Sequence, residues 1–195
     1  AALLSSQGTS ENFNAADLTL ANQSGANLPN VDFSGAILSG TDLVGTKVVR
    51  GGFANVSGAP TSNIDNNTQS TDFAGANLTQ AFFEGADLKG TQFRGANLTQ
   101  VDFTNADFSA FDDGNGSQLI SSSFAGALLL NANLVNTNVQ GANFSTANLH
   151  RANLEGLVAT PVFNVYENFN TPTEFRDTNL TQARLNGADF SGAIL

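Results

Sequence analysis

The chain of 195 residues contains no cysteine, methionine or tryptophan, and only one tyrosine and one histidine. The absence of cysteine excludes a disulfide framework, a thiolate metal site and a cysteine nucleophile. Charged residues make up only 12% of the chain, against about 25% in an average protein. Because 41% of the residues are hydrophobic, the chain can form a core and is not a solvated tail.

Basic residues are also scarce. There are 7 Lys+Arg against 17 Asp+Glu, which gives a formal net charge of -10. We therefore expect no direct binding of nucleic acid and no polybasic membrane patch. The apolar stretches are too short to span a bilayer, and no signal peptide precedes Ala1, so we expect no membrane insertion. Localisation stays open, since such a chain fits an exported (periplasmic or lumenal) protein and a cytoplasmic one equally well.

The dominant feature is a repeat of five residues. Segments such as Ala76-Asn77-Leu78-Thr79-Gln80 and Ala86-Asp87-Leu88-Lys89-Gly90 share a small residue, an Asp or Asn, a large apolar centre, a variable residue and often Gly. Twelve of the 16 Phe are centres, and 13 of the 19 Gly lie two residues after a centre. The 30 centres are Phe13, Leu18, Gln23, Leu28, Phe33, Leu38, Leu43, Val48, Phe53, Phe73, Leu78, Phe83, Leu88, Phe93, Leu98, Phe103, Phe108, Leu119, Phe124, Leu129, Leu134, Val139, Phe144, Leu149, Leu154, Phe175, Leu180, Leu185, Phe190 and Leu195.

A period of five fits neither an α-helix nor a continuous β-strand. Within a unit, the small residue and the centre are two apart, so an extended segment points both inward, and the Gly then allows a tight turn. Phe13, Phe33 and Phe53 are 20 residues apart, which is four units. We therefore predict a square coil of about 7 to 8 turns. Adjacent turns would pair as parallel strands about 4.8 Å apart, which makes a rod roughly 36 Å long.

The tandem pattern A-(D/N)-(L/F)-x-x resembles the pentapeptide repeat family. The resemblance covers residues 11–195 apart from three interruptions. It implies an all-β fold, a right-handed quadrilateral parallel β-helix, and a single repeat domain over 11–195 preceded by an N-terminal cap at 1–10. It says little about function, because the motif residues build the wall and the turns.

The first two interruptions lie near residues 54–70 and 111–116. The first preserves the five-residue phase and is either an irregular coil or an outward loop; the spacing of 20 from Phe53 to Phe73 mildly favours the coil. The second contains Asp112, Asp113 and Asn115, which suggest a calcium loop. No distal Glu completes such a loop, so we favour a plain turn.

The third interruption, near residues 157–172, is richer in apolar side chains. It contains Val158, Val162, Val165 and the candidate contact residues Phe163, Tyr166 and Phe169. Such a segment either folds back over the rod as a flap or stays exposed as a contact patch. The packed flap is the favoured interpretation.

The last coil ends on Leu195 without a polar cap. Its unpaired backbone groups and the apolar side chains of Leu185, Phe190 and Leu195 predict either a weak homodimer formed tail to tail or a coil that continues into further sequence.

No group of residues predicts catalysis. His150 lies after the centre Leu149 beside Arg151, where we expect a solvated side chain without an orienting partner. The Asp residues that precede centres form carboxylate pairs by repetition alone and are interpreted as a solubilising outer wall. We expect no catalytic residue, no cofactor, no metal site and no enzyme activity.

The composition and the repeat favour a non-catalytic scaffold or protein-binding solenoid, whose protein partner is unknown. The alternative is an acidic rod that mimics DNA and binds a type II topoisomerase such as gyrase, as a subset of the similar family does. Mimicry requires unbroken columns of Asp. The predicted columns Asn12, Asp32, Gly52, Asp72, Gln92 and Asn22, Asp42, Phe82, Asp102 are both interrupted, so we expect no inhibition of gyrase supercoiling.

Overall fold

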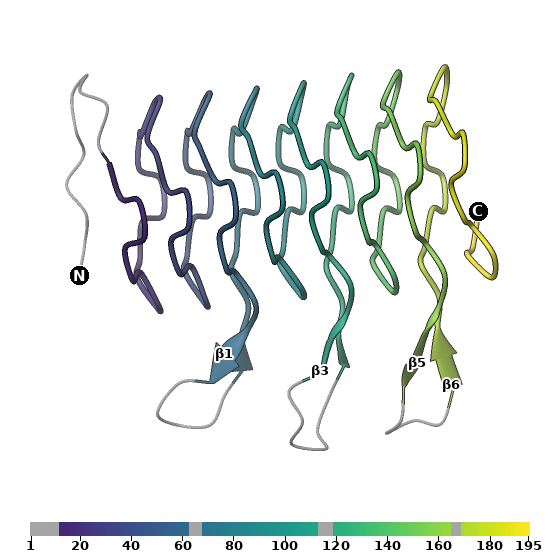
Figure 1. Cartoon of the computed structure of the whole chain (residues 1–195), viewed down its shortest axis with the longest axis horizontal. Coiled ribbons are helices and arrows are strands. Elements are labelled where there is room, and N and C mark those ends of the chain that lie inside the picture. The colour runs from purple at the N-terminus through teal and green to yellow at the C-terminus, as the bar shows by residue number, and fades with distance from the viewer. Residues whose placement is uncertain (1–11, 63–67, 113–118, 165–168) are drawn as a thin grey trace.

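A computed structural model describes residues 12–62, 68–112, 119–164 and 169–195, and in this part the chain winds into stacked turns of one coil (Figure 1). Parallel bridges join residues 20 apart in the sequence, such as Asn12 with Asp32 and Asp17 with Ile37. Each turn contributes one bridge to each of four columns, so the coil has four walls. The predicted square coil with parallel pairing is confirmed.

We call the four walls A to D, in the order in which the chain passes through them. Their bridged, outward-facing residues are as follows. Wall A contains Asn12, Asp32, Gly52, Phe82, Asp102, Asn133, Asn153 and Arg184. Wall B contains Asp17, Ile37, Ser57, Asp87, Asp107, Asn138, Val158 and Asp189. Wall C contains Asn22, Asp42, Asp72, Gln92, Ser123, Asn143, Glu174 and Ile194. Wall D contains Asn27, Lys47, Asn77, Asn97, Leu128, Asn148 and Asn179.

Each corner between two walls is a tight turn. The N–H of the small residue bonds to the carbonyl of the preceding centre, as from Ala36 to Phe33 at 2.8 Å. The residue two after the centre has a positive φ, which glycine adopts without a Cβ clash. All 13 glycines predicted at this position have φ between 63° and 73°. The predicted turn position is therefore correct.

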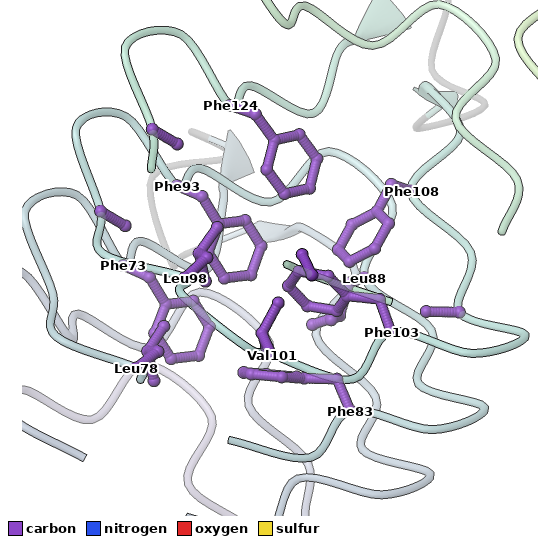
Figure 2. Packing of buried hydrophobic residues seen from close by; sticks show 14 of the residues in the cluster. Phe73, Leu78, Phe83, Leu88, Phe93, Leu98, Val101, Phe103, Phe108 and Phe124 are labelled. Carbon is purple, nitrogen blue, oxygen red and sulfur yellow. The ribbon is translucent and has the colours of Figure 1, made fainter. Parts of the chain in front are cut away.

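The centres fill the interior with stacked aromatic rings (Figure 2). Phe93 is fully buried and stacks on Phe73 at 4.9 Å and on Phe124 at 5.1 Å between ring centroids. The Phe centres of wall A form a second column of rings, which packs edge to face against the first column. The spacing of 20 residues suggested that Phe53 and Phe73 lie in one column, but they do not. Phe53 stacks on Phe83 at 4.4 Å between ring centroids, whereas its ring is inclined by 83° to that of Phe73.

All three interruptions are antiparallel hairpins that project from the coil (Figure 1). The first consists of β1 (Thr61–Ser62) and β2 (Thr68–Gln69), the second of β3 (Phe111–Asp112) and β4 (Leu119–Ile120), and the third of β5 (Val162–Asn164) and β6 (Phe169–Thr171). Bridged residues are 30 apart across the first insert, as in Asp42 and Asp72, and 31 apart across the other two. Relative to the usual 20, the inserts add 10, 11 and 11 residues.

These hairpins correct the predicted insert boundaries. The segment near 54–70 is a loop rather than a coil, but Gly58 still occupies a buried centre, so the hairpin begins after it. Leu119 is not a centre, because its backbone pairs with Asp112 in the second hairpin. The third insert begins after Ala159, which is buried, and Val158 belongs to wall B. The predicted cap at residues 1–10 lies outside the described residues.

Candidate interaction surfaces

The three hairpins leave the coil at one corner, between walls B and C. They follow Gly58, Phe108 and Ala159, which are wall B centres in every second turn of the coil. The two turns between them, Lys89-Gly90 and Gln140-Gly141, and the flanking turns Ser39-Gly40 and Ser191-Gly192 close without an insert. Since parallel strands are about 4.8 Å apart, neighbouring hairpins leave the rod about 10 Å apart. We call this row of three hairpins the hairpin edge.

A buried hydroxyl anchors each hairpin where the chain returns to the coil. Thr71, Ser122 and Thr173 are fully buried. Their hydroxyls donate to the carbonyls of the preceding wall B centres: Thr71 to Leu38, Ser122 to Leu88 at 3.2 Å, and Thr173 to Val139 at 3.1 Å. Thr71 Oγ1 also lies 2.9 Å from the Gly58 carbonyl oxygen. This carbonyl, which a short turn would pair with a backbone N–H, therefore shares the single hydroxyl hydrogen of Thr71 with Leu38.

The hairpin roots also cover the glycines of the intervening turns. A Cβ added at Gly90 would lie 2.8 Å from Pro60 Cγ and 3.1 Å from Ile120 Cγ2, which belong to the first and second hairpins. A Cβ at Gly141 would lie 3.3 Å from Ala110 Cβ and 3.5 Å from Val162 Cγ2, at the roots of the second and third hairpins. The hairpins and the glycines between them therefore form one packed edge.

The three predicted contact residues belong to the third hairpin. Phe163 lies on β5 and is 56% exposed. Phe169 lies on β6, where its backbone pairs with that of Asn164, and Tyr166 lies outside the described residues. The root of this hairpin packs on the coil, whereas its paired strands extend away from the coil (Figure 1). A contact role for these aromatic residues stays a prediction.

The carboxylates form no long column in the described residues. Because the first insert is a loop, the predicted columns are wrong: Gly52 is bridged to Phe82, and Asp72 to Asp42. The longest runs of bridged carboxylates are two residues, Asp42 with Asp72 and Asp87 with Asp107. In the second pair, Lys89 Nζ lies 3.4 and 3.2 Å from the two carboxylates. The columns are interrupted, as expected, although their members differ.

Asp and Asn share the outward position because both cap the turn that follows. The side-chain oxygen accepts the backbone N–H two residues later, as in Asp32 with Ser34 at 2.9 Å and Asn77 with Thr79 at 3.2 Å. The interpretation of the Asp residues as a solubilising wall leaves out this capping role. The signal was present, since Asp or Asn followed two residues later by Ser or Thr is typical of such turns.

We expect these caps to make stability depend on pH in the acid range. In each of Asp17, Asp32 and Asp189, the carboxylate accepts hydrogen bonds from the Ser or Thr two residues later in the sequence. The hydroxyl of that residue, and to a smaller extent its backbone N–H, lowers the pKa of the aspartate below its ordinary value of 3.8. A carboxyl with a lowered folded-state pKa stabilises the fold above its unfolded-state pKa and loses this contribution as the pH falls through the folded value. We therefore expect the melting temperature of the triple variant Asp17→Asn, Asp32→Asn, Asp189→Asn to fall less between pH 5 and pH 2.5 than that of the parent. At pH 7 it should melt close to the parent, because Asn caps equivalent turns. Equal acid sensitivity of the two proteins would contradict the capping role.

His150 and the residues that suggested a calcium loop are the remaining candidates from the sequence. His150 is half-buried rather than fully solvated; its backbone N–H donates to Asn148 Oδ1, and its carbonyl accepts from the N–H of Asn131. No group of three potential metal ligands occurs among the described residues. Of the residues that suggested a calcium loop in the sequence, Asp113 and Asn115 lie outside the described residues. Within the same residues, no helix is long and apolar enough to cross a membrane.

The last turn of the coil exposes apolar side chains. Leu185 is 42% and Leu195 is 76% exposed, whereas Phe190 is half-buried. Association of two copies through this turn stays a prediction.

Comparison with known proteins places the repeats in a family. The family model for pentapeptide repeats matches eight copies, at residues 12–48, 71–109, 115–151 and 173–195, which is more than half of the chain. No curated protein sequence matches. Solved structures that are similar include HetL of the cyanobacterium Nostoc, a pentapeptide repeat protein involved in heterocyst differentiation regulation, at 24% identity, a TM-score of 0.39, and coverage of 100% of this chain and 68% of that one.

Two further similar structures are a thylakoid-lumen pentapeptide repeat protein of Arabidopsis thaliana and QnrB1, a plasmid-mediated fluoroquinolone resistance protein. The first is 26% identical, covers 62% of this chain and 69% of that one, and has a TM-score of 0.32. The second is 17% identical, covers 95% and 86%, and has a TM-score of 0.39. The model match, the repeat spacing and the four-walled coil agree, and the chain belongs to the pentapeptide repeat family.

Proposed function

We propose that the chain is a right-handed, non-catalytic rod that binds another protein, and that the hairpin edge is its main contact. The observation that carries this proposal is the alternation of hairpins and glycine turns along one corner. Inserts of a repeat protein that gather on one side commonly form its binding face, because the coil holds them at fixed spacing. Here the anchoring hydroxyls and the packed glycines hold the three hairpin roots in place.

Each hairpin can be replaced by a short turn of the kind that the same corner already contains. Replacing residues 59–70, 109–121 and 160–172 each by Ser-Gly restores the native turns Ser39-Gly40 and Ser191-Gly192 at the same corner. We expect this hairpinless rod to fold and to unfold cooperatively, as judged by far-UV circular dichroism.

Affinity capture from a native cell extract then tests the function. We expect the hairpinless rod to lose the proteins that the parent rod captures. The control variant Phe82→Ser, which changes an exposed residue of wall A, should capture the same proteins as the parent. The same set of proteins on the parent and the hairpinless rod would contradict the proposal.

DNA mimicry is the second candidate, and the charge pattern does not favour it. Runs of two carboxylates are shorter than a duplex mimic requires, and Lys89 neutralises part of one run. We expect no inhibition of gyrase supercoiling at micromolar concentrations of this chain.

A further inference from the structure

Wall D differs from the other three walls in charge. None of its seven five-residue units, which lie at 26–30, 46–50, 76–80, 96–100, 127–131, 147–151 and 178–182, contains Asp or Glu. In the described residues, walls A, B and C with the corners that follow them contain four carboxylates each when the hairpins are left out; Asp112 in the second hairpin is a further one. Those of the walls and corners are Asp32, Glu84, Asp102, Glu155, Asp17, Asp87, Asp107, Asp189, Asp42, Asp72, Glu174 and Asp177. Wall D instead contains Lys47, Arg50 and Arg151, so this acidic protein has one basic side.

The basic groups of wall D differ from most of those on the other walls, which pair with carboxylates. Lys89 contacts Asp87 and Asp107, Arg176 contacts Glu174, and Arg184 contacts Glu155, whereas Arg94 Nε donates to Ser123 Oγ at 3.4 Å. Within the described residues, Lys47, Arg50 and Arg151 form no ion pair. The charge of wall D is therefore available to a ligand.

Two glutamines orient the arginines. Arg50 Nε donates to Gln80 Oε1 at 2.9 Å, and Arg151 Nε donates to Gln182 Oε1 at 2.7 Å. Gln80 Nε2 donates in turn to Gln100 Oε1 at 2.9 Å. These contacts use the Nε atoms and leave the terminal guanidinium nitrogens, which bind carboxylates in pairs, without a hydrogen bond in the described part of the chain.

The corner between walls D and A has no glycine at all. Its seven turn residues all have φ between 54° and 59°. This conformation is sterically strained for a residue with a Cβ atom but not for glycine. The seven residues are Asn30, Arg50, Gln80, Gln100, Asn131, Arg151 and Gln182. Glycine occupies most turns at the other corners, so the repeat accepts it readily. Five of the seven side chains are long and polar, and their retention in strained positions indicates that they are used; the other two are Asn, which adopts this conformation more readily.

Wall D also has an exposed apolar patch. Leu128 is 43% exposed, and Leu130 lies beside it, half-buried. The hydrogen bond from Asn131 N to His150 O places this pair next to the turn that carries Arg151. An apolar patch within a polar rim, with arginine present and acidic residues absent, matches the usual composition of a protein interface.

From these observations we propose that wall D and the D–A corner form a docking face for a protein surface that bears carboxylates around an apolar patch. Arg50 and Arg151 are four turns of the coil apart, about 19 Å at the spacing of parallel strands. A net charge of -10 repels a long polyanion such as DNA, whereas a compact acidic patch meets only this wall. The D–A corner is diagonally opposite the hairpin edge, so the rod can hold two proteins at once.

Fluorescence anisotropy with a labelled poly-glutamate peptide tests the docking face at about 0.1 M salt, where charges beyond about 10 Å are screened. We expect Arg50→Glu/Arg151→Glu to weaken binding about tenfold or more. The matched control Arg176→Glu/Arg184→Glu changes the net charge equally but alters arginines that are already paired, and it should stay within about threefold of the parent.

A second variant separates binding from folding. Gln80→Gly/Gln100→Gly removes side chains from the strained corner, so it should not lower the melting temperature, yet binding should fall severalfold because Arg50 loses its anchor. The hairpinless rod should bind the peptide as the parent does, which keeps this test independent of the proposed function. Absence of peptide binding by the parent, equal loss in both arginine pairs, or tighter binding of heparin or duplex DNA than of the peptide would overturn the proposal.

Discussion

Replacing Phe93 by Asp should abolish the cooperative unfolding transition of the rod. The Phe93 ring is fully buried between Phe73 and Phe124, and Phe103 and Phe108 meet it edge to face. Truncation of such a ring costs about 3–5 kcal/mol. A carboxylate in its place would have no water, and its burial adds several kcal/mol. The sum reaches the whole stability of a typical domain, about 5–15 kcal/mol, so far-UV circular dichroism should show no thermal transition.

The matched control is Phe82→Asp, which places the same carboxylate beside the buried centre Phe83. Phe82 is 53% exposed on wall A, between Gly52 and the carboxylate of Asp102. Its replacement should shift the melting temperature by only a few degrees. A Phe93→Asp protein that melts with the parent, or a Phe82→Asp protein that fails to fold, would mean that the inward and outward positions of the repeat are assigned wrongly.

The register of the repeat was predictable because each position of the unit has its own physical requirement. Centres must fill a closed interior, and turn residues must accept positive φ, so Phe and Gly separate in the sequence as they do in space. Gly58 and Ala159 escaped prediction because they are small residues at centre positions. They lie at the roots of hairpins, where the chain leaves the coil.

The assignment of residues to walls was not predictable in full, because it depends on the length of each insert. The first insert adds ten residues, which is two whole units, so Phe53 and Phe73 keep a spacing of 20 although they lie on different walls. In the second, Leu119 lies five residues before Phe124 by coincidence and belongs to a hairpin. Wall D, with no carboxylate, becomes visible only after these lengths are known. Its members are far apart in the sequence.

Replacing Gly90 by Ala should destabilise the rod more than replacing Gly95 by Ala. Both glycines close a turn at nearly the same φ, +65° and +63°, so both variants incur the strain of a left-handed alanine, about 1–2 kcal/mol. A Cβ at Gly95 meets nothing within 4 Å, whereas a Cβ at Gly90 meets Pro60 Cγ at 2.8 Å and Ile120 O at 3.3 Å. Overpacking of this kind adds about 1–3 kcal/mol. We therefore expect Gly90→Ala to lose about 2–5 kcal/mol of unfolding free energy in a urea titration, and Gly95→Ala only about 1–2 kcal/mol.

The same pair in the hairpinless rod decides whether the hairpins cause the difference. With residues 59–70 and 109–121 each replaced by Ser-Gly, Pro60 and Ile120 are gone, and only the strain of the turn remains at both positions. Gly90→Ala and Gly95→Ala should then lose equal free energy of unfolding. An unequal loss in the hairpinless rod, or an equal loss in the parent, would mean that the hairpin roots do not pack on the intervening turn. The three hairpins would then move independently, and the hairpin edge would not present a partner with one fixed surface.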